Sequence, residues 1–92
     1  MKISVIIPVY NEEKYLEACL ESLINQSVPA DEIIVVNNNS KDRTAQIAKK
    51  YPVKIINEKK QGMISARNRG FNSATCEIIA RTDADTILPH NW

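Results

Sequence analysis

The sequence predicts an α/β domain of Rossmann-like type, in which strands and helices alternate and a parallel sheet is flanked by helices. Four short apolar runs are separated by three longer segments with helical periodicity. Each connection is long enough to hold a helix, so the strands are expected to run parallel with right-handed crossovers. The chain of 92 residues has room for one domain, residues 1–92, around a single core.

The first strand is expected at residues 3–7, where the sequence is apolar on both faces. Pro8 is expected to end this strand, and Asn11 to cap the helix that follows. The apolar pairs of that helix recur every four residues: Tyr15/Leu16, Cys19/Leu20 and Leu23/Ile24. This spacing predicts an amphipathic helix.

The second and third strands are expected at residues 33–36 and 53–56, which are short β-branched runs. Between them, Ser40 is expected to cap a helix that Pro52 terminates. One face of that helix carries Thr44, Ile47, Ala48 and Tyr51.

A third helix is expected to open at Gly62, and a fourth strand, buried and apolar, is expected at residues 78–80. One side of the helix carries Met63, Ala66, Gly70 and Ala74. Because glycine inside a helix costs about 1 kcal/mol relative to alanine, Gly70 predicts a close packing contact.

Charge and cysteine content exclude several classes of function. Twelve basic and eleven acidic residues give a net charge of +1, so neither nucleic acid nor an anionic membrane surface is an expected partner. No stretch approaches the roughly 18 apolar residues of a membrane span. Cys19 and Cys76 lack metal-site spacing and are expected to be reduced thiols. The expected compartment is the cytoplasm, or the cytoplasmic face of a membrane if an anchor lies beyond residue 92.

The strongest chemical candidate is the pair of carboxylates Asp83 and Asp85, which follows the fourth strand directly. In an extended segment, residues i and i+2 project to the same side. Mg²⁺ and Mn²⁺ prefer oxygen ligands and, with phosphates, take only one or two protein carboxylates. The pair is therefore a candidate metal site, with a solvated acidic turn as the alternative.

Two further candidates lie at the other predicted strand ends, where ligands of parallel sheets bind. The helix that opens at Gly62 and carries Arg67 is suited to a diphosphate, although Arg67 also fits a solvated helix face. Tyr10, with Asn37 or Asn38, offers a flat surface and polar groups for a base. His90 has no partner at ligand or catalytic spacing and is expected to be an ordinary loop residue.

Four segments together resemble the serial motifs of family 2 glycosyltransferases: Val5-Ile6-Ile7-Pro8-Val9-Tyr10-Asn11-Glu12-Glu13, Glu32-Ile33-Ile34-Val35-Val36-Asn37-Asn38-Asn39-Ser40, residues 62–70 and Asp83-Ala84-Asp85. The resemblance covers nearly the whole chain in the correct order. It implies part of the GT-A fold, an inverting reaction, a nucleotide-diphospho-sugar donor that is expected to be linked to UDP, and Mn²⁺ or Mg²⁺. The implied acceptor is a hydroxyl group, as in a polysaccharide or a lipid.

The resemblance also assigns roles by residue. Val9 and Tyr10 would border the base, whose edge Asn37 or Asn38 would meet. The remaining implied contacts are Arg67 near the diphosphate, Asp83 near the ribose and with Asp85 at the metal, and Pro8 and Glu12 in the first substrate-binding loop.

The chain departs from the family pattern in two respects. Asn37-Asn38-Asn39-Ser40 stands where the family usually has at least one Asp, so weaker uracil recognition is expected. The acceptor half and the general base normally follow the acidic motif, so the piece is expected to be a truncated donor-binding half that is inactive alone and self-associates. The alternative is a noncatalytic nucleotide-binding or interaction module. A dinucleotide-binding domain is disfavoured because the first strand-to-helix turn lacks G-x-G-x-x-G.

Overall fold

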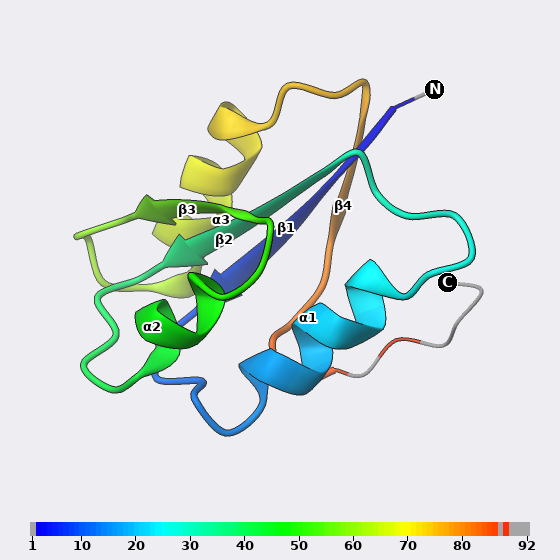
Figure 1. Cartoon of the computed structure of the whole chain (residues 1–92). Coiled ribbons are helices and arrows are strands. Elements are labelled where there is room, and N and C mark those ends of the chain that lie inside the picture. Colours follow the sequence, from blue (N-terminus) through cyan, green and yellow to red (C-terminus); the bar gives the residue numbers. More distant parts are fainter. Residues whose placement is uncertain (1, 87, 89–92) are drawn as a thin grey trace.

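The computed structural model describes residues 2–86 and 88, which form a four-stranded parallel sheet with helices on both faces (Figure 1). The strand order is β3-β2-β1-β4. The strands are β1 (Ile3–Val9), β2 (Glu32–Asn37), β3 (Lys54–Asn57) and β4 (Ile78–Arg81). The helices are α1 (Leu16–Ile24), α2 (Thr44–Ala48) and α3 (Met63–Ser73). The predicted alternation and the parallel pairing are confirmed.

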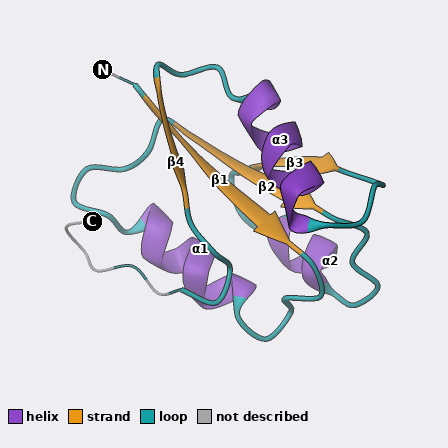
Figure 2. Ribbon diagram, turned by 180° about the vertical axis from the view of Figure 1, so that it is seen from behind, coloured by secondary structure: helices purple, strands orange, loops and turns teal. Residues whose placement is uncertain are grey.

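The two central strands, β1 and β2, separate two apolar layers. Helices α1 and α2 cover one face of the sheet and α3 covers the other (Figures 1 and 2). In β1, Val5 and Ile7 pack into the layer beneath α1, whereas Ile6 packs into the layer beneath α3. Burial on both faces explains why these strand sequences are apolar without alternation.

The strand β4 lies at the edge of the sheet, and its burial differs from the prediction. Among the described residues it pairs with β1 alone. Ile78 is 39% exposed and Ile79 is 37% exposed. The expectation of a buried fourth strand is therefore wrong, because a short apolar run does not reveal whether its strand has one neighbour or two.

Pro8 lies inside β1 and does not end it. The carbonyl of Ile6 accepts a hydrogen bond from the N–H of Thr82, at 3.1 Å, so the backbone N–H and C=O of Ile6 face the side of β1 on which β4 lies. Because these groups alternate in direction along a strand, those of every second residue of β1 face the same side. Pro8 faces that side too, beyond the last residue of β4, Arg81. The N–H that proline lacks therefore has no strand partner there, and β1 continues past it.

Helix α3 packs closely on the sheet through Ala66 and Gly70, which are both buried. A Cβ at Gly70 would overlap Cγ2 of Ile6 and would lie 3.1 Å from Cγ2 of Val36. The close packing predicted for Gly70 is confirmed. Met63, predicted on the same packed side, is 40% exposed because it is the first residue of the helix.

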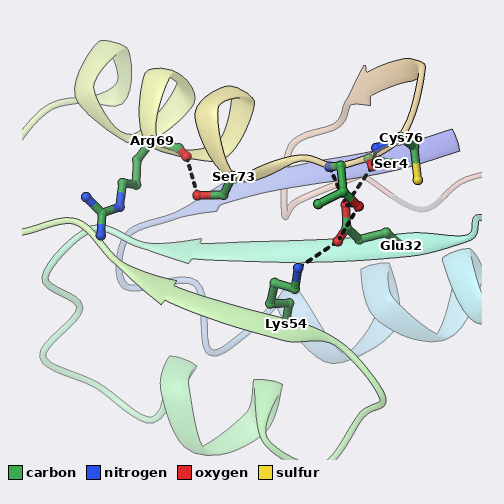
Figure 3. Close-up of polar contacts among 7 residues, drawn as sticks. Ser4, Glu32, Lys54, Arg69, Ser73 and Cys76 are labelled. Atoms are coloured by element: carbon green, nitrogen blue, oxygen red, sulfur yellow. Dashed lines mark hydrogen bonds and ion pairs between the residues drawn. The ribbon is translucent and has the colours of Figure 1, made fainter.

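Glu32, at the start of β2, joins three other segments at the amino ends of the strands (Figure 3). Its carboxylate accepts hydrogen bonds from Ser4 Oγ at 2.7 Å and Thr75 N at 3.0 Å, and lies 2.7 Å from Lys54 Nζ. Lys54 first, then Ser4 and Thr75, lower the pKa of Glu32 from 4.5 to about 2. No sequence motif had indicated this cluster.

Candidate functional site

The carboxyl ends of β1, β2 and β3 lie side by side, at the end of the sheet where these strands finish. Val9 is in register with Asn37, which is in register with Asn57. Backbone hydrogen bonds continue past the strand ends, from Asn38 N to Val9 O at 2.9 Å and from Glu58 N to Asn37 O at 3.0 Å. The predicted gathering of these loops at one edge is therefore confirmed.

The loops that follow β1 and β2 are tied together by side chains. Ser40 Oγ accepts the N–H of Asn11 at 3.0 Å, and Asn11 Oδ1 accepts the N–H of Lys41 at 2.8 Å. Thr44, which is fully buried, accepts the N–H of Glu12 at 2.9 Å. These contacts set the path of the loop that carries Tyr10 and Glu12, and Thr44 had not been identified from the sequence as part of it.

The same contacts correct two predicted helix caps. Asn11 has a left-handed backbone, with φ of 51°, and α1 begins five residues later after Tyr15, which makes no side-chain cap bond. Ser40 does not cap α2 either, because Arg43 is its N-cap residue. Both polar side chains were recognised correctly as hydrogen-bonding groups, but their partners are in the neighbouring loop.

The three residues of the first predicted base-binding segment differ in exposure. Pro8 and Val9 are buried within β1, whereas Tyr10 is 41% exposed beyond its end. Tyr10 is therefore the one whose ring is free to contact a ligand. Val9, in contrast, has no exposed surface in this structure.

Asn37 and Asn38 have different surroundings although they are adjacent in sequence. Asn37 Oδ1 accepts the N–H of Ser40 at 3.0 Å, and Asn37 is 8% exposed. Asn38 is 1% exposed, and its amide bonds to the backbone of Glu58, Lys60 and Gly62. The second asparagine thus joins the loop after β2 to the loop after β3.

The loop after β3 leads into α3, where Gly62 is the N-cap residue, as predicted. Gly62 has φ of 129°, a conformation that side chains disfavour. Arg67 follows in the second turn, and its buried Nε has no hydrogen-bond partner among the described residues. A cation close to a helix amino terminus, with a donor that has no partner among the described residues, is suited to an anion.

The acidic motif forms a turn and not the expected extended segment. The N–H of Thr86 donates to the carbonyl of Asp83 at 3.1 Å. Ala84, between the two carboxylates, is buried at 3% exposure and anchors the turn in the core. Asp85 and Asp83 are exposed. Oδ1 of Asp83 lies 3.3 Å from Nη1 of Arg81.

Two side chains of helix α1 form hydrogen bonds with the turn and with the residues just after it. Cys19 Sγ donates to the carbonyl of Asp83 at 3.6 Å, and Ser22 Oγ accepts the N–H of Leu88 at 3.1 Å. Burial, with the nearby carboxylates of Asp85 and Asp83, raises the pKa of Cys19 to about 11. The sequence predicted that Cys19 lies on the apolar face of the helix, which is confirmed, but not its contact with the acidic turn.

Carboxylates from three segments lie close enough together to affect the pKa of one of them, Glu12. Burial raises the pKa of Glu12 above 4.5, and Asp85, Asp42 and Asp83 raise it further, in that order. Within the part of the chain that the structure describes, no group of three or more potential ligands has the geometry of a metal site. His90 lies outside the described residues.

The search for a membrane span in residues 2–86 and 88 found no helix that is long and apolar enough.

Comparison with known proteins identifies the family. The model of glycosyl transferase family 2 matches residues 4–92. A dolichol-phosphate mannosyltransferase of Pyrococcus furiosus is 42% identical over 95 residues, which are 97% of this chain and 27% of the relative. The chain spans 28% and 26% of the length of two other curated relatives.

Two solved structures are similar in fold. S. aureus TarS 1-349 in complex with UDP has a TM-score of 0.91 and 34% identity, over 99% of this chain and 29% of that one. Glucosyl-3-phosphoglycerate synthase from Mycobacterium tuberculosis, with Mn²⁺, UDP and glucosyl-3-phosphoglycerate, has a TM-score of 0.84 and 26% identity, over 97% and 35% of the two chains. The predicted α/β fold of GT-A type is confirmed, and the chain belongs to glycosyl transferase family 2.

Proposed function

We propose that this chain binds the donor of an inverting glycosyltransferase, a UDP-linked sugar, which is transferred to a hydroxyl acceptor such as a polysaccharide or a lipid. The observation that carries the proposal is the buried Nε of Arg67, which has no hydrogen-bond partner among the described residues. Arg67 lies in the second turn of α3, and this helix begins beside Asn38, at the carboxyl end of β2. A diphosphate fits that cation, and a base fits the exposed ring of Tyr10. The UDP complex of the similar TarS structure supports this choice of nucleotide.

A divalent cation, Mn²⁺ or Mg²⁺, fits the acidic turn. Asp85 and Asp83 are exposed oxygen donors, and their effect on the pKa of Glu12 reflects a negative potential that a cation relieves. Asp85 would be the main ligand, with Asp83 shared between the ribose and the metal. When bound, the cation neutralises charge on the diphosphate as it leaves. The similar structure with Mn²⁺ and UDP supports the assignment.

The residues of this chain would hold the donor and stabilise its leaving group. Arg67 and the free N–H groups at the start of α3 would bind the diphosphate, where negative charge increases during the displacement. Tyr10 and Asn37 would orient the nucleoside. In an inverting displacement, a base removes the acceptor proton while the acceptor oxygen attacks the anomeric carbon. We assign that base to a part of the protein outside residues 1–92.

Calorimetry tests the proposed donor site. UDP is expected to bind more tightly with Mn²⁺ than without it, and Asp85→Asn is expected to remove the difference. Glu77→Gln is a suitable control, because Glu77 is exposed at the amino end of β4, the opposite end of the sheet. Equal affinity with and without Mn²⁺ in the unmodified chain would exclude the metal role of Asp85.

A transfer assay tests whether the general base lies outside residues 1–92. With a radiolabelled donor and a panel of hydroxyl acceptors, residues 1–92 are expected to show only slow donor hydrolysis. Sugar transfer well above that background would show that the base lies within these residues. Absence of any nucleotide binding in the titrations would instead favour a noncatalytic interaction module.

A further inference from the structure

The side chain of Asn38 is buried beneath the loop that joins β3 to α3. Its Nδ2 donates to the carbonyls of Glu58 at 2.9 Å and Lys60 at 2.8 Å. Its Oδ1 accepts the N–H of Gly62 at 2.9 Å. Asn38 is 1% exposed, so its side chain has almost no contact with solvent.

These three hydrogen bonds use the chemical asymmetry of an amide. The amide has two N–H donors, and both are directed at carbonyl oxygens. A carboxylate has no donor when it is ionised, so it would bring negative charge against the two carbonyls. Residue 38 therefore requires an amide for a reason within the protein.

The contacts extend along the two loops. Gln61 Nε2 donates to the carbonyl of Asn38, and Asn39 Nδ2 donates to the carbonyl of Lys59, each at 3.4 Å. The shortest bonds of the set, however, involve the Asn38 side chain, and one of them is donated by the N–H of Gly62, the N-cap residue of α3. Helix α3, which carries Arg67, begins directly after this loop.

We infer that Asn38 is a positioning residue that sets the amino end of α3 for the donor's diphosphate. The inference rests on the proposed function, because it needs a diphosphate at the start of α3.

The test compares UDP with uridine, which lacks the phosphates. Asn38→Asp is expected to weaken UDP binding by about tenfold or more, and uridine binding by less than about twofold, in calorimetric titrations. Asn39→Asp adds the same charge to the same loop at an exposed residue with φ of 67°, which Asp tolerates, and serves as the control. It is expected to change the ratio of the two affinities much less.

Equal losses for UDP and uridine, tighter binding of either, or the same effect from Asn39→Asp would overturn the inference. If Asn38→Asp does not fold, hydrogen exchange in the unmodified chain decides the question. The side-chain amide protons of Asn38 and the N–H of Gly62 are then expected to exchange slowly without ligand. Fast exchange of the Asn38 amide would overturn the inference. Failure of the unmodified chain to bind UDP would refute the proposed function. The exchange of the Asn38 amide would still decide whether Asn38 holds the loop before α3 in place.

Discussion

The α-carbon of Gly70 in α3 faces Cγ2 of Ile6 in β1 so closely that no Cβ fits between them. Cγ2 of Val36 in β2 closes the other side, 3.1 Å from the same position. Ile6 and Val36 are fully buried branched side chains with little freedom to move. Gly70 therefore sets the distance between α3 and the two central strands, whose carboxyl ends form the candidate site.

Gly70→Ala is expected to destabilise the protein. The added methyl group overpacks the layer at a cost of about 1–3 kcal/mol, against a gain in helix propensity of about 1 kcal/mol. Denaturation in urea measures the difference, and Asn72→Ala, at an exposed residue of the same helix, is the control with an expected change within about 0.5 kcal/mol. A Gly70→Ala protein as stable as the original would mean that α3 moves away from the sheet without cost.

Glu32→Gln is expected to lower stability at neutral pH but not in strong acid. The folded pKa of Glu32, about 2, lies below its usual value of 4.5. Its contribution is therefore complete above about pH 5 and is lost as the pH falls through 4.5 toward 2. At pH 7 the expected loss of unfolding free energy is on the order of 1–2 kcal/mol, since hydrogen bonds to a charged group are replaced by neutral ones.

Urea denaturation of both proteins between pH 7 and pH 2.5 checks this prediction. Glu77→Gln removes an exposed carboxylate near the same end of the sheet and serves as control. A difference between Glu32→Gln and the original that stays constant down to pH 2.5 would be inconsistent with the ion pair to Lys54.

Asn37→Asp is expected to strengthen UDP binding several-fold, by about 1 kcal/mol. A carboxylate at residue 37 keeps the bond from the N–H of Ser40 and can accept the ring N–H of uracil with a full charge. A neutral amide can also turn over and present its donor to cytosine. Titration with uridine, cytidine and guanosine diphosphates measures affinity and selectivity together. No gain for UDP would show that the loop after β2 does not read the base.

The edge strand β4 is expected to cause self-association at high protein concentration. Ile78 and Ile79 are more than a third exposed on a strand that pairs with β1 alone within the described residues, and such an edge can pair with another chain. Sedimentation velocity over a wide concentration range measures the effect, and Ile79→Lys is expected to reduce it. A single monomer at every concentration would contradict the expectation.

The local pattern of the sequence predicted most of the fold. Helix periodicity depends on neighbours three and four residues away, so it located α1 and α3 to within a few residues and predicted the burial of Cys19. Pro8 was misjudged because its effect depends on the adjacent strand: a missing N–H ends a strand only where a partner would accept it.

By itself, the sequence determined the order of the elements, the parallel sheet and the polar residues that gather at its carboxyl edge, because each of these depends on residues close together in the chain. Only the tertiary structure decided the partners of those polar residues. Asn11 and Ser40 have the chemistry of helix caps but bond to each other's loops, about thirty residues away. The side chain of Asn38 bonds to residues 20, 22 and 24 positions further on, whereas the side chain of Asn37 bonds to Ser40, three residues ahead. An amide has the same donors and acceptor wherever it stands, so its role is set by the groups that the folded chain brings within hydrogen-bonding distance.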